Sequence, residues 1–169
     1  MRVLGIDPGT LQLGYGLIEE VHGNLHAYDF GTLKFRSSLP MEQRLYQIYS
    51  HLLNMVGLLS PDEIAIEEPF MGQGDNQYVS SAFAIGQAQA AVLIASASQS
   101  IPIFRYSPSQ VKSSVADHGS ASKEQVQTMV NLILSLSEPP KTFDASDALA
   151  IALCHLRQRT ITNLIDNST

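Results

Sequence analysis

The chain has 169 residues, 44% of them hydrophobic, which is typical of one soluble globular domain with a sizeable core and excludes a disordered or fibrous protein. Its net charge of −6 argues by itself against a nucleic-acid binder. No apolar run approaches the roughly 20 residues of a membrane span, and the single cysteine cannot form an intramolecular disulfide, so we expect a cytoplasmic protein without membrane contact.

Three strands are predicted at the start of the chain. The first, residues 1–7, is a short apolar run that ends at Asp7. The Pro-Gly pair that follows predicts a hairpin-like turn into a second strand over residues 14–20. A third strand is predicted over residues 24–35.

The apolar pattern then changes period. Apolar residues recur every three or four positions from Met41 to Leu59, which predicts an amphipathic helix. A fourth strand, residues 63–68, follows this helix and ends in two glutamates, Glu67 and Glu68. Alternation along the strand predicts that Glu68 points to the face opposite Glu67.

The second half of the chain is predicted to alternate helices with one strand. The segment 78–98 is small or apolar nearly all round, and its stripe of small residues would let another backbone approach closely. A fifth strand is predicted over residues 101–106. The remaining helices are predicted over residues 107–116, 120–136 and 143–159.

This order of elements indicates an α/β fold with a five-stranded mixed sheet flanked by helices. Strand–helix–strand units in the second half should place their strands parallel. We expect a single domain over residues 1–157 and a flexible, polar C-terminal tail over residues 158–169.

Four acidic side chains stand where such a fold could bring them together. Asp7 and Glu67 end two strands, and parallel neighbouring strands would present both acids at the edge where α/β sheets bind ligands. Asp144 and Asp147 are three residues apart at the start of the last helix and share a face. Carboxylates without a His/Cys pattern suit Mg²⁺ or Mn²⁺, and two such ions about 4 Å apart can assist an in-line phosphoryl displacement.

Each acid also has a structural explanation. Asp7 before Pro-Gly could accept an Asx-turn hydrogen bond, and Glu67 could be a solvated strand end. Asp144 could cap the last helix, with Asp147 in a first turn favoured by the helix dipole. The conjunction of all four acids is what favours a site.

Basic residues are concentrated in the second half of the chain. Residues 105–159 hold six basic side chains against five acids, a net of +3 once Asp144 and Asp147 are set aside as metal ligands. A modest cationic face on an acidic protein is therefore compatible with a nucleic-acid substrate.

Four stretches together resemble the RuvC family of Holliday junction resolvases: GIDPGTLQLGYGLIE, AIEEPF, SPSQVKSSVADHGSASKEQVQTMV and DASDALAIALCH. They spread from residue 2 to about residue 157. The resemblance implies a ribonuclease H-like fold and a homodimer. It also implies Mg²⁺-dependent, symmetric nicking of opposed strands of a four-way DNA junction during recombination and repair. A RuvA/RuvB-type branch-migration complex is a further candidate partner.

Carried over residue by residue, the resemblance assigns roles to seven positions. The family's catalytic acids, which would hold two Mg²⁺ ions with Mn²⁺ as a substitute, fall on Asp7, Glu67, Asp144 and Asp147. Its DNA-contacting lysines match Lys112 and Lys123, and Phe70 matches an aromatic residue that stacks against unpaired bases at the crossover.

Two features depart from the family pattern. The segment 71–90 lacks the lysine and arginine that are usual there, which affects sequence preference at the cut and the dimer. The acidic net charge implies weaker or more salt-sensitive DNA binding. Two alternatives stay open: a ribonuclease H-like nuclease for another branched DNA or RNA substrate, and a non-catalytic junction-binding module. The presence of all four acids favours an enzyme.

Overall fold

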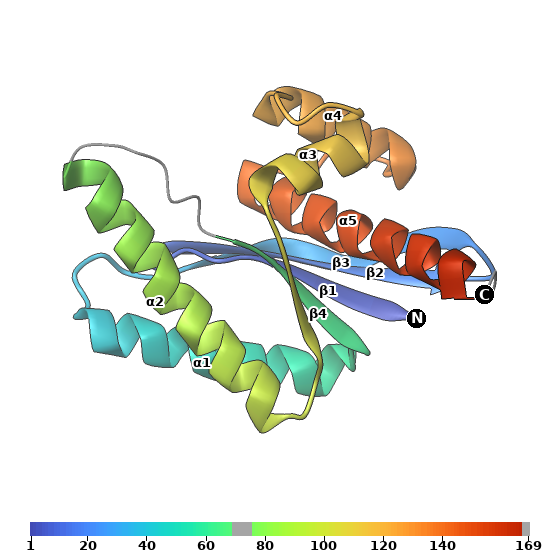
Figure 1. Ribbon diagram of the computed structural model, residues 1–169. Helices are drawn as coiled ribbons and strands as arrows, with labels where there is room; N and C mark the ends of the chain where they lie inside the picture. The colour runs from blue at the N-terminus through green and yellow to red at the C-terminus, as the bar shows by residue number, and fades with distance from the viewer. Residues whose placement is uncertain (69–75, 167–169) are drawn as a thin grey trace.

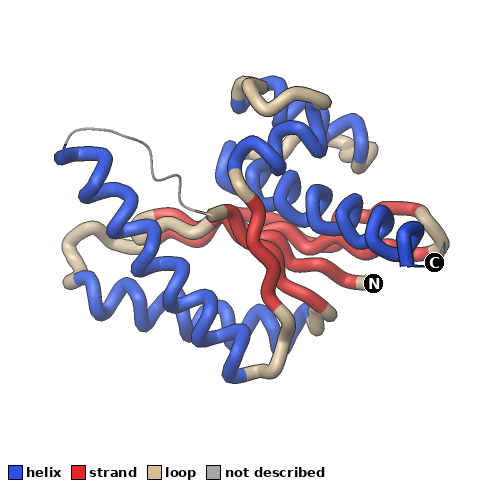
Figure 2. Tube along the Cα trace, viewed as in Figure 1, coloured by secondary structure: helices blue, strands red, loops and turns tan. Residues whose placement is uncertain are grey.

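A computed structural model describes residues 1–68 and 76–166. For residues 76–79 and 166 it describes the backbone alone. One five-stranded sheet runs through the molecule (Figures 1 and 2). Its strands are β1 (Arg2–Asp7), β2 (Gln12–Val21), β3 (Asn24–Lys34), β4 (Glu63–Glu67) and β5 (Ile103–Tyr106).

The sheet is mixed, as the order of elements predicted. Its strand order is β3-β2-β1-β4-β5. The pairs β1–β2 and β2–β3 are antiparallel, while β4 runs parallel to both β1 and β5. The predicted hairpin after Asp7 and the predicted parallel pairing in the second half are both confirmed. β2 starts at Gln12 and ends at Val21, and so is longer than the predicted strand over residues 14–20.

Helices cover both faces of the sheet (Figure 1). One face carries α1 and α2, and the other carries α3, α4 and α5. The helices are α1 (Met41–Leu59), α2 (Asn76–Ser98), α3 (Pro108–Ala116), α4 (Lys123–Ile133) and α5 (Phe143–Asp166).

Alternation along the strands divides the core between the two faces. In β1, Leu4 and Ile6 pack in the cluster with α1 and α2, whereas Val3 packs in the cluster with α5. Since successive side chains of a strand point to opposite faces, Asp7 belongs to the α5 face with Val3. The strand pattern therefore directs this acid toward the helix that carries the two other aspartates.

The C-terminal segment differs from its prediction. α5 continues to Asp166, so residues 158–166 are helical where the polar composition favoured a flexible tail. Within this segment, the Arg159 guanidinium donates to Glu63 Oε1 at 2.8 Å, a tertiary contact between α5 and β4. Residues 167–169 lie outside the described residues.

Helix α2 corrects the expectation that no segment could span a membrane. Ser80–Ser98 is long and apolar enough to do so by length and composition alone. It packs instead as a domain helix, because Ala88, Val92 and Ala95 are buried in the core shared with α1 and the sheet. Its apolar composition thus supplies part of the core, and the side facing away from the sheet keeps exposed apolar residues.

Candidate active site

Asp7 and Glu67 lie at the carboxyl ends of neighbouring parallel strands. β1 and β4 pair with Ile6 opposite Ile66, so the next residue of each strand leaves the sheet at the same edge. Ala65, two residues before Glu67, packs in the cluster with α5, and alternation places Glu67 on that same face. The expected meeting of two strand-end acids is confirmed.

A buried glutamine holds the end of β4. Gln89 of α2 donates its side-chain N–H to the carbonyl oxygen of Glu67 at 2.5 Å. On the other side, Tyr106 of β5 pairs with Glu67, and the backbone N–H of Glu68 donates to the Tyr106 carbonyl at 2.8 Å. Gln89 was not predicted as a site residue. In the sequence it differs from its neighbours only as a polar residue in a helix of mostly small and apolar residues.

Helix α5 packs against the sheet at positions where the strands carry glycines. A Cβ atom at Gly5 would meet the backbone of Ala148, and one at Gly14 would meet the backbone of Asp144. Gly14 is also the residue that pairs with Asp7 across β1 and β2. Because no side chain separates helix from sheet here, the first turns of α5 lie directly beside the strand end that carries Asp7.

The first turn of α5 is capped by Thr142 rather than by Asp144. The backbone N–H of Ala145 donates to the Thr142 hydroxyl oxygen at 3.3 Å, the hydrogen bond of a threonine N-cap. The same hydroxyl shares a 2.6 Å hydrogen bond with Thr32 of β3. The structural explanation of Asp144 as a helix cap is therefore wrong.

The four acids interact electrostatically, and we call Asp7, Glu67, Asp144 and Asp147 the carboxylate cluster. Burial, reinforced first by the negative charge of Asp147, then by Glu67 and Asp144, raises the pKa of Asp7 to about 7. Burial and Asp147 also raise the pKa of Glu67 to about 7. An Asx-turn hydrogen bond would lower the pKa of Asp7, so that explanation does not account for its state.

Lys123 is the cation in contact with the carboxylate cluster. Its ammonium group donates to Asp147 Oδ2 at 3.1 Å, from the first residue of α4. Burial works to lower the pKa of Lys123, but the charge and hydrogen bond of Asp147 raise it overall. The capping box of Ser122 and Gln125 fixes the start of this helix, and so positions the lysine.

Of the other two predicted DNA-binding residues, the structure describes Lys112 but not Phe70. The positive charge of Lys112, on α3, partly offsets the burial that raises the pKa of Glu67 and of Asp147, so this lysine too lies near the carboxylate cluster. Phe70 lies outside the described residues. Two separate helices therefore bring a lysine to the same group of acids.

In their present conformations, the side chains of the carboxylate cluster do not converge on one metal-binding position. Within residues 1–68 and 76–166, no three His, Cys, Asp or Glu side chains are grouped to hold one metal ion. The donor chemistry still fits a hard divalent ion, because all four groups are carboxylates and a cation would offset both the burial and the mutual repulsion that raise the pKa values of Asp7 and Asp147. Binding would require Asp147 to exchange Lys123 for the ion.

A second polar group lies farther along α5, and we call Tyr106, His155, Glu63 and Arg159 the His155 network. His155 is fully buried, with Tyr106 Oη 2.6 Å from its Nδ1 and Glu63 Oε2 2.5 Å from its Nε2. Burial lowers the pKa of His155. A neutral ring that donates through Nε2 and accepts from Tyr106 satisfies every contact. Cys154, next to His155 on the helix, is also fully buried.

Comparison with known proteins identifies relatives over nearly the whole chain. A family model for crossover junction endodeoxyribonuclease RuvC matches residues 3–155. A protein of that name from Dehalococcoides mccartyi is 49% identical over 98% of this chain and 96% of its own. Another from Chloroflexus aggregans is 44% identical over 92% of each chain.

Solved structures give the same result. The structure of Thermus thermophilus RuvC in complex with a Holliday junction substrate matches with a TM-score of 0.86 and 34% identity, covering 96% of both chains. The yeast mitochondrial Holliday junction resolvase Ydc2 shares the fold, with a TM-score of 0.67 and 15% identity. The predicted ribonuclease H-like, mixed-sheet α/β fold is thus confirmed.

Proposed function

The chain belongs to the RuvC family of crossover junction endodeoxyribonucleases, and we propose that it resolves four-way DNA junctions by nicking opposed strands at the carboxylate cluster. One observation carries this proposal. Carboxylates from β1, β4 and α5 meet at one sheet edge closely enough that burial and mutual repulsion raise the pKa of Asp7 to about 7. Such a perturbed group of acids is typical of a functional site rather than of a stabilising one.

We infer that the carboxylate cluster holds two Mg²⁺ ions, for which Mn²⁺ can substitute. Asp7, Glu67, Asp144 and Asp147 would hold these ions, and Asp7 interacts electrostatically with each of the other three acids. When bound, the ions supply the charge that activates water and stabilises the departing 3′ oxygen. Four carboxylates and two divalent ions are neutral together, so a phosphodiester is no longer repelled.

The protonation of the cluster links metal binding to pH. Near pH 7 and without metal, Asp7 and Glu67 are each partly protonated, because both have a pKa of about 7. Binding of a divalent ion requires the carboxylates and therefore releases these protons. Cleavage should accordingly rise between pH 6 and pH 8.

Lys112 and Lys123 are proposed to hold backbone phosphates beside the cut. Lys123 lies at 3.1 Å from Asp147 and keeps more than half of its side chain exposed, so it can turn from the acid to a phosphate. Phosphate contacts of this kind position DNA without reading its sequence. Phe70, outside the described residues, keeps its proposed stacking role on the resemblance alone.

We propose that the protein acts as a homodimer, since two symmetric cuts require two sites related by a two-fold axis. The outer side of α2 supports this, because Phe83 and Ile94 are exposed apolar side chains there. A groove of about 300 Å³ between α1 and α2 continues this surface, lined by Tyr46 and Ala90 among others. The stripe of small residues, expected to admit another backbone, includes Gly86, where an added Cβ would contact none of the residues that the structure describes.

The remaining proposals follow from the family. A cytoplasmic location and a RuvA/RuvB-type branch-migration partner are consistent with an enzyme that acts on DNA. The acidic net charge of −6 predicts that junction binding is weaker than in a basic protein.

The experiment compares cleavage of a synthetic four-way junction, a linear duplex and an RNA–DNA hybrid, each with 10 mM Mg²⁺. We expect paired nicks in opposed strands of the junction alone. Asp7→Asn should lower the rate about a thousandfold while junction binding persists, because the variant removes one charge from the cluster. The matched control is Glu68→Gln, which removes an exposed acid next to Glu67 and should cut at the wild-type rate.

Other outcomes would contradict the proposal in distinct ways. Equal cutting of all three substrates would indicate an unspecific nuclease. Preference for the hybrid would indicate an RNA-directed one. Junction binding without cleavage by the wild-type protein would indicate a binding module.

A further inference from the structure

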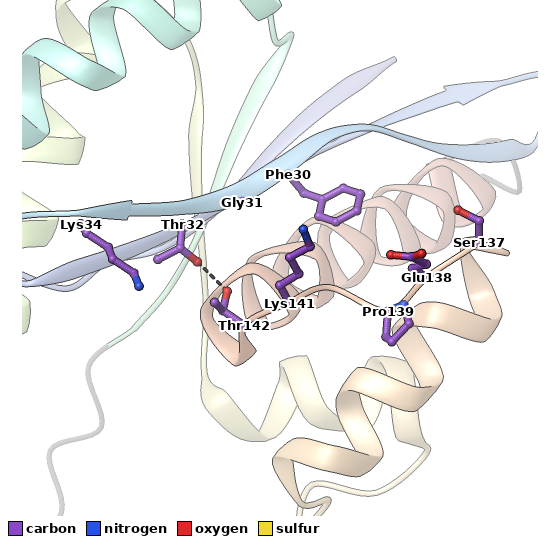
Figure 3. Close-up of a pocket in the computed structure, with 9 residues that line it drawn as sticks. All are labelled: Phe30, Gly31, Thr32, Lys34, Ser137, Glu138, Pro139, Lys141 and Thr142. Atoms are coloured by element: carbon purple, nitrogen blue, oxygen red, sulfur yellow. Dashed lines mark hydrogen bonds between the residues drawn. The ribbon is translucent and has the colours of Figure 1, made fainter.

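A polar pocket of about 510 Å³ lies next to the carboxylate cluster, between the end of β3 and the loop that leads into α5 (Figure 3). Two lysines and two threonines line it: Lys34 and Thr32 from β3, and Lys141 and Thr142 from the loop. Figure 3 shows Lys34 and Lys141 on either side of the Thr32–Thr142 hydrogen bond. Glu138, the one acidic residue among those lining the pocket, lies toward its far end.

The sheet register fixes the place of this pocket relative to the acids. Asp7 pairs with Gly14 on β2, and Gly14 pairs with Thr32 on β3. Two strand spacings, about 10 Å, therefore separate Thr32 from Asp7. Thr142 precedes Asp144 by two residues and caps the same helix, so the pocket and the carboxylate cluster share one rigid support.

The pocket offers hydrogen-bond donors without partners of opposite charge. Neither Lys34 nor Lys141 forms an ion pair with any residue that the structure describes. The Thr142 oxygen already accepts from Ala145, and the two threonine hydroxyls share one hydrogen bond. One hydroxyl proton therefore stays available to an acceptor in the pocket. Two ammonium groups and a hydroxyl are the donors that phosphate oxygens accept.

We propose that this pocket binds backbone phosphates of the strand being cut, about one to two nucleotides from the scissile phosphate, because about 10 Å is more than the distance between adjacent phosphates of one strand and less than twice that distance. The proposal rests on the junction-cleaving function and adds a subsite to it. The subsite holds the strand in register with the carboxylate cluster and reads no bases. It also supplies cationic contacts on a protein whose net charge is −6.

The first test measures junction binding without divalent ions, at several salt concentrations, for Lys34→Gln, Lys141→Gln and the double variant. Each lysine lost should raise Kd about fivefold and reduce the slope of log Kd against log salt by about 0.9 per phosphate contact. The matched control is Arg105→Gln, which removes the same charge from an exposed position in β5, the opposite edge of the sheet. It should change Kd less than twofold.

The second test locates the contact on the DNA. Single phosphates of the cut strand are replaced by neutral methylphosphonates, and Kd is measured for the wild type and the double variant. Neutralising phosphates about one to two nucleotides from the cut should weaken junction binding by the wild type but leave binding by the double variant unchanged.

Three results would overturn the subsite: equal losses in the lysine variants and Arg105→Gln, an unchanged salt slope, or equal methylphosphonate effects in wild type and double variant. If the wild type cuts the junction symmetrically while these results appear, the subsite alone fails. If the wild type does not cut the junction, the proposed function itself fails.

Discussion

The two halves of α5 hold ionisable side chains in opposite electrostatic situations. At its start, the carboxylate cluster gathers like charges whose burial raises the pKa of Asp7 and Glu67. Farther along the same helix, the His155 network pairs its members, with Arg159 on one oxygen of Glu63 and His155 on the other. One helix thus carries acids whose negative charges are largely uncompensated at its start, and a group of paired, hydrogen-bonded side chains farther along.

The difference teaches how this fold separates function from stability. Repulsion among acids costs folding energy, and such a cost persists where it serves the chemistry of a site. A buried network with every hydrogen bond made instead holds elements together, here β4, β5 and α5. Perturbation of the first group should change cleavage, and perturbation of the second should change stability.

Among substitutions outside the carboxylate cluster, the largest expected effect comes from one that displaces the cluster without changing its members. In Gly14→Ala the new methyl group meets the backbone of Asp144, so the start of α5 must shift. A displacement of about 1 Å should lower the cleavage rate about a hundredfold, and overpacking should cost about 1–3 kcal/mol in urea unfolding. The control is Gly57→Ala in α1, where a Cβ contacts nothing; it should gain up to about 1 kcal/mol. Normal cleavage by Gly14→Ala would show that the contact of α5 with bare strand does not position the acids.

The second effect concerns the His155 network. Glu63→Gln removes the charge that faces both His155 and Arg159, and we expect a loss of about 2–3 kcal/mol in the free energy of unfolding. Cleavage at 25 °C should stay within twofold of the wild type, because no member of the network belongs to the cluster. The control, Glu19→Gln, breaks a more exposed ion pair with Arg2 and should cost at most about 1 kcal/mol. A large loss of cleavage by folded Glu63→Gln would remove the distinction between the two regions.

The smallest effect is a pH dependence of opposite sign in the two regions. The raised pKa of Asp7 means that its carboxyl destabilises the metal-free fold above pH 7 and ceases to do so toward pH 4. The lowered pKa of His155 means that its network loses stability as pH falls below 6.5. In EDTA, the Tm of the wild type relative to Asp7→Asn should therefore rise by about 3 °C from pH 8 to pH 6. A constant difference would show that Asp7 does not titrate in this window.

Much of the candidate site could be predicted from chain-local signals. The apolar run ending at Asp7 and the β-branched run ending at Glu67 both indicated strands, and parallel pairing then implied a shared edge. The role of Gly14 was not predictable, because a glycine in a strand suits a bend, a bulge or a close contact equally well. Asp144 was the helix cap that the sequence suggested, but Thr142, which bonds to Thr32 on a distant strand, takes that place.

The order of residues was enough to predict which strand residues alternate, which segments form helices, and that the acids are oxygen donors suited to hard cations. These properties depend on neighbours a few positions apart, which the order of residues specifies directly. The tertiary structure alone decided that α5 lies against bare glycine backbone, that it continues through Arg159 to Asp166, and that Lys34 and Lys141 flank one pocket. Those outcomes depend on packing between elements far apart in the chain, where the distance of closest approach is set by the side chains that meet.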